Sequence, residues 1–115
     1  MSSKIKQIVE IFESYTFSTH DEKYLQAEIS QAFDLENISH KREVSIKGGI
    51  IDFMIGDIGL EIKIKGQPMS IFRQLERYAQ DDSVNTLILA NVKTMTLPDT
   101  INGKTARSVT VRGAL

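Results

Sequence analysis

The chain contains no cysteine, which excludes disulfide bonds and metal sites built from thiolates. A reducing compartment such as the cytoplasm is compatible with this composition, and we expect a cytoplasmic protein. The amino-terminal stretch has no long apolar run, so neither a signal peptide nor a membrane-spanning segment is expected. Repeats, low-complexity tracts and linkers are also lacking, and 115 residues are therefore expected to form a single domain.

An excess of positive charge is missing too. The formal net charge is −1, whereas a compact DNA-binding domain is often strongly basic. This balance argues mildly against nucleic acid as a partner, but it does not exclude it, because a metal site needs carboxylates that offset basic residues elsewhere. Hydrophobic residues make up 41% of the chain and charged residues 25%, which is typical of a folded globular protein.

Apolar residues at helical spacing predict three helices, over residues 4–15, 20–33 and 68–80. Thr19 and Glu22 fit a capping box that would start the second helix, and Pro68 suits the first turn of the third. Five strands are expected, with tight turns at Gly48-Gly49 and Gly56-Asp57. They cover residues 42–46, 50–55, 60–65, 86–90 and 108–112.

Residues 92–106 give no clear pattern, although the segment 97–103 could hold one helical turn. The resulting order α-α-β-β-β-α-β-β predicts one α/β domain, with a mixed sheet flanked by helices.

Asp52 interrupts the otherwise apolar run of residues 50–55, where an aspartate is disfavoured. If Gly56 and Asp57 are the two loop residues of the hairpin, Asp52 lies opposite Glu61, with Cβ atoms about 4.5–5.5 Å apart. Two carboxylates this close repel each other unless a cation lies between them. Oxygen ligands of this kind suit Mg²⁺ or Mn²⁺.

Lys63 is two residues after Glu61 and therefore lies on the same face of the third strand. There its ammonium group could hold a nucleophilic water or stabilise a developing charge. An alternative is a solvated sheet face on which Lys63 merely pairs with a carboxylate. A turn centred on Asp57-Ile58 is a second alternative, and it would place Asp52 opposite Lys63.

Two helices carry further polar residues on their apolar sides. Glu28 lies on the stripe of the second helix and either points at the metal or extends past the stripe to water. Gln74 and Tyr78 are four residues apart on the buried side of the third helix. Arg73 and Arg77, on another line of that helix, either contact phosphates or form a solvated face with Glu76.

These residues together resemble the PD-(D/E)XK nuclease superfamily, which has the restriction-endonuclease-like fold. The helix acid matches Glu28, the motif aspartate matches Asp52, and the (D/E)XK tripeptide matches Glu61-Ile62-Lys63. Gln74 to Tyr78 looks like the Q-x-x-x-Y motif of one branch, whereas Gly48-Gly49 also resembles small stand-alone VRR-NUC modules. The likeness runs from about residue 24 to residue 90, and Ile51 departs from it by standing where proline is frequent.

The resemblance implies a nuclease that uses Mg²⁺ or Mn²⁺ to hydrolyse phosphodiester bonds, with DNA as the expected substrate and internal cleavage as the expected mode. Asp52 and Glu61 would hold the metal, with help from Glu28 and the Ile62 carbonyl, and Lys63 would assist the attacking water. Gln74 and Tyr78 would position the Lys63 region or the substrate phosphates.

Other functions stay open from the sequence alone. The near-neutral charge and short chain suit a catalytically silent module that binds nucleic acid or assembles with a partner. The same metal core could also act on RNA or a cyclic nucleotide. A histidine-based nuclease is disfavoured, because His20 and His40 show no repeated spacing. The small surface left for gripping a duplex predicts a homodimer or a larger protein partner.

Overall fold

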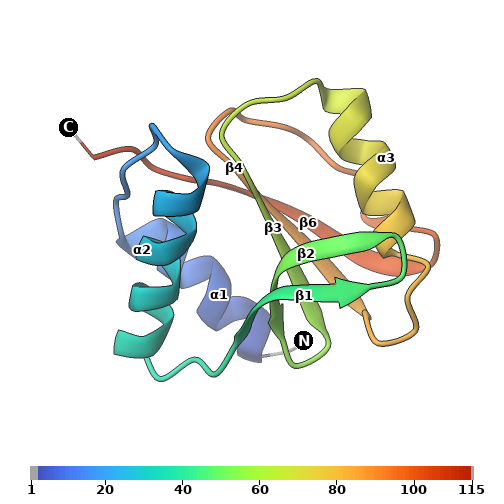
Figure 1. Ribbon diagram of the computed structural model, residues 1–115, viewed down its shortest axis with the longest axis horizontal. Coiled ribbons are helices and arrows are strands. Elements are labelled where there is room, and N and C mark those ends of the chain that lie inside the picture. Colours follow the sequence, from blue (N-terminus) through green and yellow to red (C-terminus); the bar gives the residue numbers. More distant parts are fainter. Residues whose placement is uncertain (1–2, 115) are drawn as a thin grey trace.

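Six strands form one mixed sheet with helices on both faces in the computed structural model, which describes residues 3–114 (Figure 1). The helices are α1 (Ser3–Ser14), α2 (Glu22–Leu35) and α3 (Pro68–Tyr78). The strands are β1 (Lys41–Ile46), β2 (Gly49–Ile55), β3 (Ile58–Lys63), β4 (Thr86–Asn91), β5 (Thr100–Ile101) and β6 (Lys104–Thr110). In this part of the chain no helix combines the length and apolar character needed to span a bilayer.

The strands lie in the order β1-β2-β3-β4-β6-β5. Two successive hairpins join β1, β2 and β3 in antiparallel pairs, and α3 then crosses over so that β4 runs parallel to β3. β6 is parallel to β4, which completes a parallel core of three strands. The predicted α/β domain with a mixed sheet is thereby confirmed.

Two local predictions fail at the carboxyl end. The segment 97–103 holds no helical turn; it contains β5, which pairs antiparallel with β6. Asn102 and Gly103 close that hairpin with φ angles of 47° and 79°, the left-handed pair that an Asn-Gly turn favours. The Asn-Gly turn allows β6 to begin at Lys104, earlier than the predicted start at residue 108.

The start of α2 also differs from expectation. The N-cap is Asp21, whose Oδ1 accepts a hydrogen bond from the Tyr24 backbone N–H at 3.0 Å. The predicted capping box of Thr19 and Glu22 is therefore wrong, since the nearer carboxylate does the capping. Glu22 becomes the first helical residue, and its side chain has no capping role.

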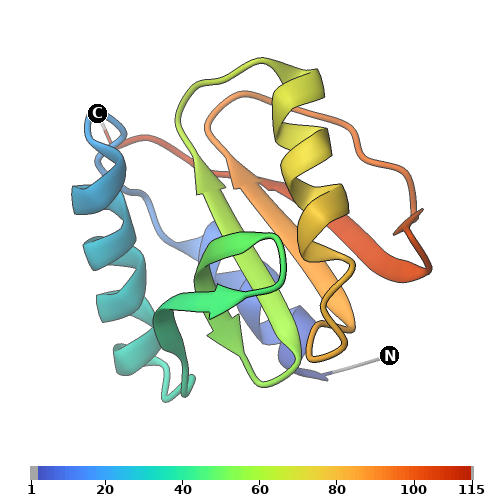
Figure 2. The ribbon, with the colours of Figure 1, turned by 45° about the vertical axis from the view of Figure 1, so that its right-hand side comes forward.

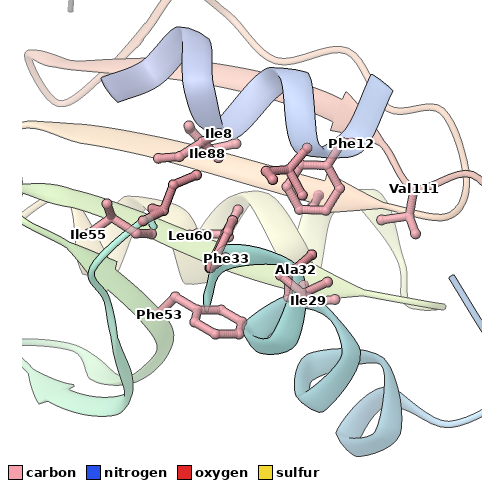
Figure 3. Close-up of a cluster of buried hydrophobic side chains, with 14 of the residues drawn as sticks. Ile8, Phe12, Ile29, Ala32, Phe33, Phe53, Ile55, Leu60, Ile88 and Val111 are labelled. Atoms are coloured by element: carbon pink, nitrogen blue, oxygen red, sulfur yellow. The ribbon is translucent and has the colours of Figure 1, made fainter. Parts of the chain in front are cut away.

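Each face of the sheet covers its own apolar core. The core under α1 and α2 includes Phe12, Phe33, Leu60 and Ile88, and Figure 3 shows the two helices meeting the strands there. The core under α3 includes Leu75, Leu87 and Leu89. β4 is buried on both faces, as the largely apolar run of residues 86–90 predicts.

β2 bends at Asp52. Ile51 and Phe53 would share one face of a regular strand, yet Ile51 belongs to the α3 core and Phe53 to the α1–α2 core. On the facing strand Glu43 has a φ of 50°, which marks a matching kink in β1. The end of the β1–β2 hairpin therefore turns away from β3 and reaches across towards α3 (Figures 1 and 2).

The tip of this hairpin lies against the last turn of α3. The turn residues are Lys47 and Gly48 rather than the predicted Gly48-Gly49. The Lys47 N–H donates to Asp81 Oδ2 at 2.6 Å, and a Cβ atom on Gly48 would lie 2.8 Å from the backbone carbon and oxygen of Arg77. Only glycine fits this approach without moving the helix or the hairpin.

Replacing Gly48 tests how tightly the hairpin is held. Gly48 has a φ of 95° and Gly103 a φ of 79°, but nothing lies within 4 Å of a Cβ atom on Gly103. Gly103→Ala should cost about 1–3 kcal/mol from backbone strain alone. Gly48→Ala should cost a further ~1–3 kcal/mol from crowding against Arg77. Urea unfolding of both variants measures the difference, and equal losses would contradict the close packing.

Candidate active site

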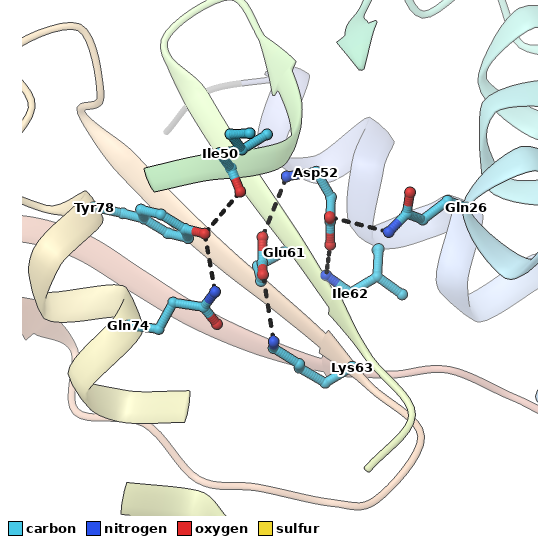
Figure 4. Close-up of polar contacts among 8 residues, drawn as sticks. All are labelled: Gln26, Ile50, Asp52, Glu61, Ile62, Lys63, Gln74 and Tyr78. Carbon is cyan, nitrogen blue, oxygen red and sulfur yellow. Dashed lines mark hydrogen bonds and ion pairs between the residues drawn. The ribbon is translucent and has the colours of Figure 1, made fainter. Parts of the chain in front are cut away.

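The ladder between β2 and β3 stops where the two motif carboxylates begin. Regular pairs run from Ile55 opposite Ile58 to Phe53 opposite Leu60, which confirms the predicted register and the Gly56-Asp57 turn. Beyond them side chains replace the backbone partners. The Asp52 N–H donates to Glu61 Oε1 at 3.2 Å, and the Ile62 N–H donates to Asp52 Oδ2 at 2.8 Å (Figure 4).

Both carboxylates have a second partner. Asp52 Oδ1 accepts a hydrogen bond from Gln26 Nε2 of α2 at 3.0 Å. Glu61 is only 3% exposed, and its Oε2 lies 3.5 Å from Lys63 Nζ. Lys63 is partly exposed and points from the same face of β3 as Glu61. The structure therefore brings Asp52, Glu61 and Lys63 together at the gap between the strands.

The carboxylates share one shielded environment that disfavours two negative charges. Burial raises the pKa of Glu61 to about 8, and the nearby charge of Asp52 adds to the effect, while Lys63 opposes it. Burial also raises the pKa of Asp52, which the Ile62 N–H opposes. The raised pKa values of both groups favour retention of one proton by the pair at neutral pH.

Gln74 and Tyr78 reach the gap from α3 and form a chain of hydrogen bonds. Gln74 Nε2 donates to the Tyr78 hydroxyl at 3.0 Å, and that hydroxyl donates to the Ile50 carbonyl at 2.8 Å. Tyr78 is 1% exposed, and its burial raises the pKa of its phenol to about 12. In this structure the two residues fix the backbone of β2 just before Asp52.

Glu28 lies elsewhere. Its Oε1 accepts a hydrogen bond from the Ser18 N–H at 2.7 Å, which ties α2 to the preceding loop. Glu28 is two positions after Gln26, which corresponds to a rotation of about 200° on an α-helix. Because Gln26 faces Asp52, Glu28 points away from it, and the expectation that Glu28 approaches the metal site is not met.

The same helix presents two groups that the sequence analysis missed. Gln26 contacts Asp52 directly, and the negative charge of Glu22 reaches Asp52 and contributes to its raised pKa. Glu22 and Gln26 are four residues apart and so share one side of α2. This spacing could have indicated that both residues face the site, but the sequence assigned Glu22 to a capping role instead.

The two arginines of α3 lie outside these contacts. Arg73 and Arg77 are exposed, and neither pairs with Glu76 within the described residues. Their contribution to phosphate binding remains a prediction.

The donor set is compatible with a divalent cation but is small. Across residues 3–114 no three or more His, Cys, Asp or Glu side chains gather in a way that could hold a metal ion. The gap does offer one buried and one partly buried carboxylate that repel each other, the arrangement that a cation relieves. Ile62 adds a backbone oxygen, because its carbonyl points to the same edge of β3 as its N–H, towards Asp52.

No protein-family model, curated protein or solved structure matches this chain. The likeness to PD-(D/E)XK nucleases therefore stays a prediction from the motifs, although the α/β fold and the contacts around Asp52 are observed directly.

The raised pKa of Glu61 predicts a pH-dependent stability. Between pH about 4.5, the ordinary value, and about 8, the folded protein holds a proton that the unfolded chain has lost. The free energy of unfolding should therefore fall as the pH rises through this range. Asp52→Asn removes the neighbouring charge, so it should weaken this fall and raise the melting temperature most near the upper end.

Asparagine at position 52 keeps an acceptor for the Ile62 N–H, and its amide can donate to Gln26 after a flip of the glutamine amide. The exposed Asp82 supplies the control, since Asp82→Asn should leave the profile unchanged. Thermal melts in metal-free buffers across the range provide the measurement. An Asp52→Asn protein that fails to fold would identify Asp52 as a structural partner instead.

Proposed function

We propose that the protein is a metal-dependent nuclease that hydrolyses phosphodiester bonds in DNA, cutting as an endonuclease. The observation that carries this proposal is the gap between β2 and β3, where the buried carboxylate of Glu61 and the partly buried carboxylate of Asp52 replace the strand ladder beside a lysine. Holding two carboxylates this close in a shielded gap is costly even with their backbone and lysine partners, which favours a functional reason for the pair. A homodimer or a larger partner would supply further DNA-binding surface.

Asp52, Glu61 and the Ile62 carbonyl are the groups that would hold Mg²⁺ or Mn²⁺. When bound, such an ion lowers the pKa of a coordinated water and offsets the charge of the scissile phosphate. Binding requires Glu61 to lose its proton, so the affinity for the ion should increase with pH up to about 8. The bound ion would then relieve the repulsion between the two carboxylates, which a proton relieves when no ion is bound.

Lys63 contributes the positive charge closest to the carboxylates. Its Nζ lies 3.5 Å from Glu61 Oε2, so it can orient a water beside the pair or donate to a phosphate oxygen. The bonds of Gln74 and Tyr78 act one step away, because they hold the Ile50 carbonyl and with it the bend that aims Asp52. We assign these two residues a positioning role.

Glu22 takes the place that the resemblance gave to Glu28. It lies on the side of α2 that faces Asp52, and its charge influences Asp52 without a direct hydrogen bond. This suits a carboxylate that binds a metal-coordinated water rather than the ion itself.

The deciding experiment is a cleavage assay with Mg²⁺ or Mn²⁺ on linear, circular, flapped and four-way DNA. Lys63→Ala should lower the cleavage rate about 100-fold or more, the loss expected for one charge-stabilising donor. Lys65 is exposed and two residues further along, so Lys65→Ala is the matched control and should keep its activity. The products of circular DNA separate internal cleavage from end processing.

Two results would contradict the proposal. Metal-independent cleavage would place the chemistry elsewhere, and DNA binding without any cleavage would favour the silent binding module. Cleavage of RNA or a cyclic nucleotide alone would retain the site and change the substrate.

The two glutamates of α2 provide a second test on one helix. Glu22→Gln should reduce metal-dependent cleavage, and higher Mn²⁺ should partly restore it, because the ion would lose an outer anionic partner. Glu28→Gln should leave the rate unchanged, since the amide oxygen can still accept from the Ser18 N–H. Rates measured over a range of Mn²⁺ concentrations check both. The opposite ranking would restore Glu28 to the site.

A further inference from the structure

Asn91 is a polar residue buried at the end of an otherwise apolar strand. It is 5% exposed and is the last residue of β4. It alternates with Leu87 and Leu89, whose side chains form the core under α3, so it points to that same face of the sheet. In the parallel ladder its Cα partner is Lys63. Asn91 thus lies beside Lys63 of the candidate site, on the neighbouring strand at a spacing of about 4.8 Å.

The orientation of the Asn91 amide is fixed by a donor. The Lys93 N–H can only donate, and it does so to Asn91 Oδ1 at 3.2 Å. The NH₂ group must then point the other way, and no described residue accepts a hydrogen bond from it. Because no fully buried side-chain atom in residues 3–114 lacks a partner, this NH₂ group has access to solvent at the surface beside Lys63.

Local structure explains the role of the Asn91 side-chain oxygen but not that of its NH₂ group. The bond from Lys93 accounts for the oxygen as a turn at the strand end, a role that serine or aspartate fills equally well. An almost buried amide donor without a partner is unfavourable unless a ligand or water completes it. The unused NH₂ group is therefore available to water or to a ligand that accepts hydrogen bonds.

The location of Asn91 favours an extended anionic ligand. Lys63, Asn91 and Thr110 are register partners at the carboxyl ends of three parallel strands, the edge at which open α/β sheets bind ligands. The row spans about 10 Å, two strand spacings, which is long enough to contact more than one phosphate of an extended nucleic-acid strand. A strand lying along the row would pass Lys63 and then Asn91.

We propose that Asn91 is a substrate-binding residue whose NH₂ group donates to a non-bridging oxygen of the phosphate next to the scissile one. The inference rests on the proposed nuclease function and adds a subsite to it. The cut strand then runs from Lys63 across β4 towards Thr110, away from Asp52. Asn91 supplies affinity and register, and the chemistry stays with the carboxylates and Lys63.

Nuclear magnetic resonance can test this on the unaltered protein. With Ca²⁺ in place of Mg²⁺, a short single-stranded oligothymidylate is titrated into the ¹⁵N-labelled chain. The side-chain NH₂ signals of Asn91 should shift in parallel with the backbone signal of Lys63. Asn102 lies in the β5–β6 turn, and its NH₂ group donates to the Glu76 carbonyl of α3, so its NH₂ signals should stay in place.

The outcomes separate the two proposals. A shift at Lys63 with an unmoved Asn91 NH₂ signal overturns the subsite and leaves the nuclease proposal intact. A titration that moves no signal at all also overturns the subsite, and the cleavage assay then decides the nuclease proposal on its own. Shifts at both residues support the subsite whether or not cleavage is detected.

Kinetics supply a second readout. Asn91→Ser retains an acceptor for the Lys93 N–H, and it should raise KM on the order of 10-fold with a smaller change in kcat. A neutral methylphosphonate at the neighbouring phosphate should weaken cleavage by the native protein and have less effect on Asn91→Ser. Additive losses from the two changes would show that Asn91 does not contact that phosphate. Equal melting temperatures would verify that the fold is unchanged.

Discussion

The separation of β2 from β3 at Asp52 is the constraint on which the rest of the site depends. Two antiparallel strands normally satisfy each other's backbone groups, yet here one N–H from each strand is taken by a carboxylate of the other. The carboxylates thus have a structural duty that keeps them fixed inside the gap. Their backbone bonds compensate part of the cost of shielding two acids from water, and the raised pKa values of the pair show that a proton relieves the repulsion that is left.

The gap between β2 and β3 stays open because the β1–β2 hairpin is held by contacts with α3. Its tip packs on the last turn of α3 at Gly48, and Tyr78 holds the Ile50 carbonyl. α3 is also the crossover that connects β3 to β4 in the parallel part of the sheet. The same helix therefore connects the parallel strands and holds the end of β2 away from β3. Residues of the Q-x-x-x-Y pattern consequently contribute to the site through the backbone, at a distance from the carboxylates.

The parts of the site that follow from local rules were predictable from the sequence. A two-residue turn at Gly56-Asp57 and the two-residue period of strands are enough to place Asp52 opposite Glu61, with Lys63 on the same face. The helix contribution was not predictable in this way. Moving the N-cap from Thr19 to Asp21 frees Glu22, and only the packing of α2 shows that Gln26 rather than Glu28 faces the gap.

Asn91 was missed for a related reason: the apolar run seemed to end at Ala90, and pairing with Lys63 depends on a parallel register between distant segments.

The kink at Glu43 has a further consequence for association. β1 is one edge of the sheet, and an exposed edge can recruit a strand from another molecule. The left-handed backbone of Glu43 interrupts the regular row of donors and acceptors there, and Lys41, Arg42 and Glu43 line it with charge. The opposite edge, β5, has only two residues. Both borders therefore resist fibril-like stacking, and a second copy of the chain would have to dock through helices or loops.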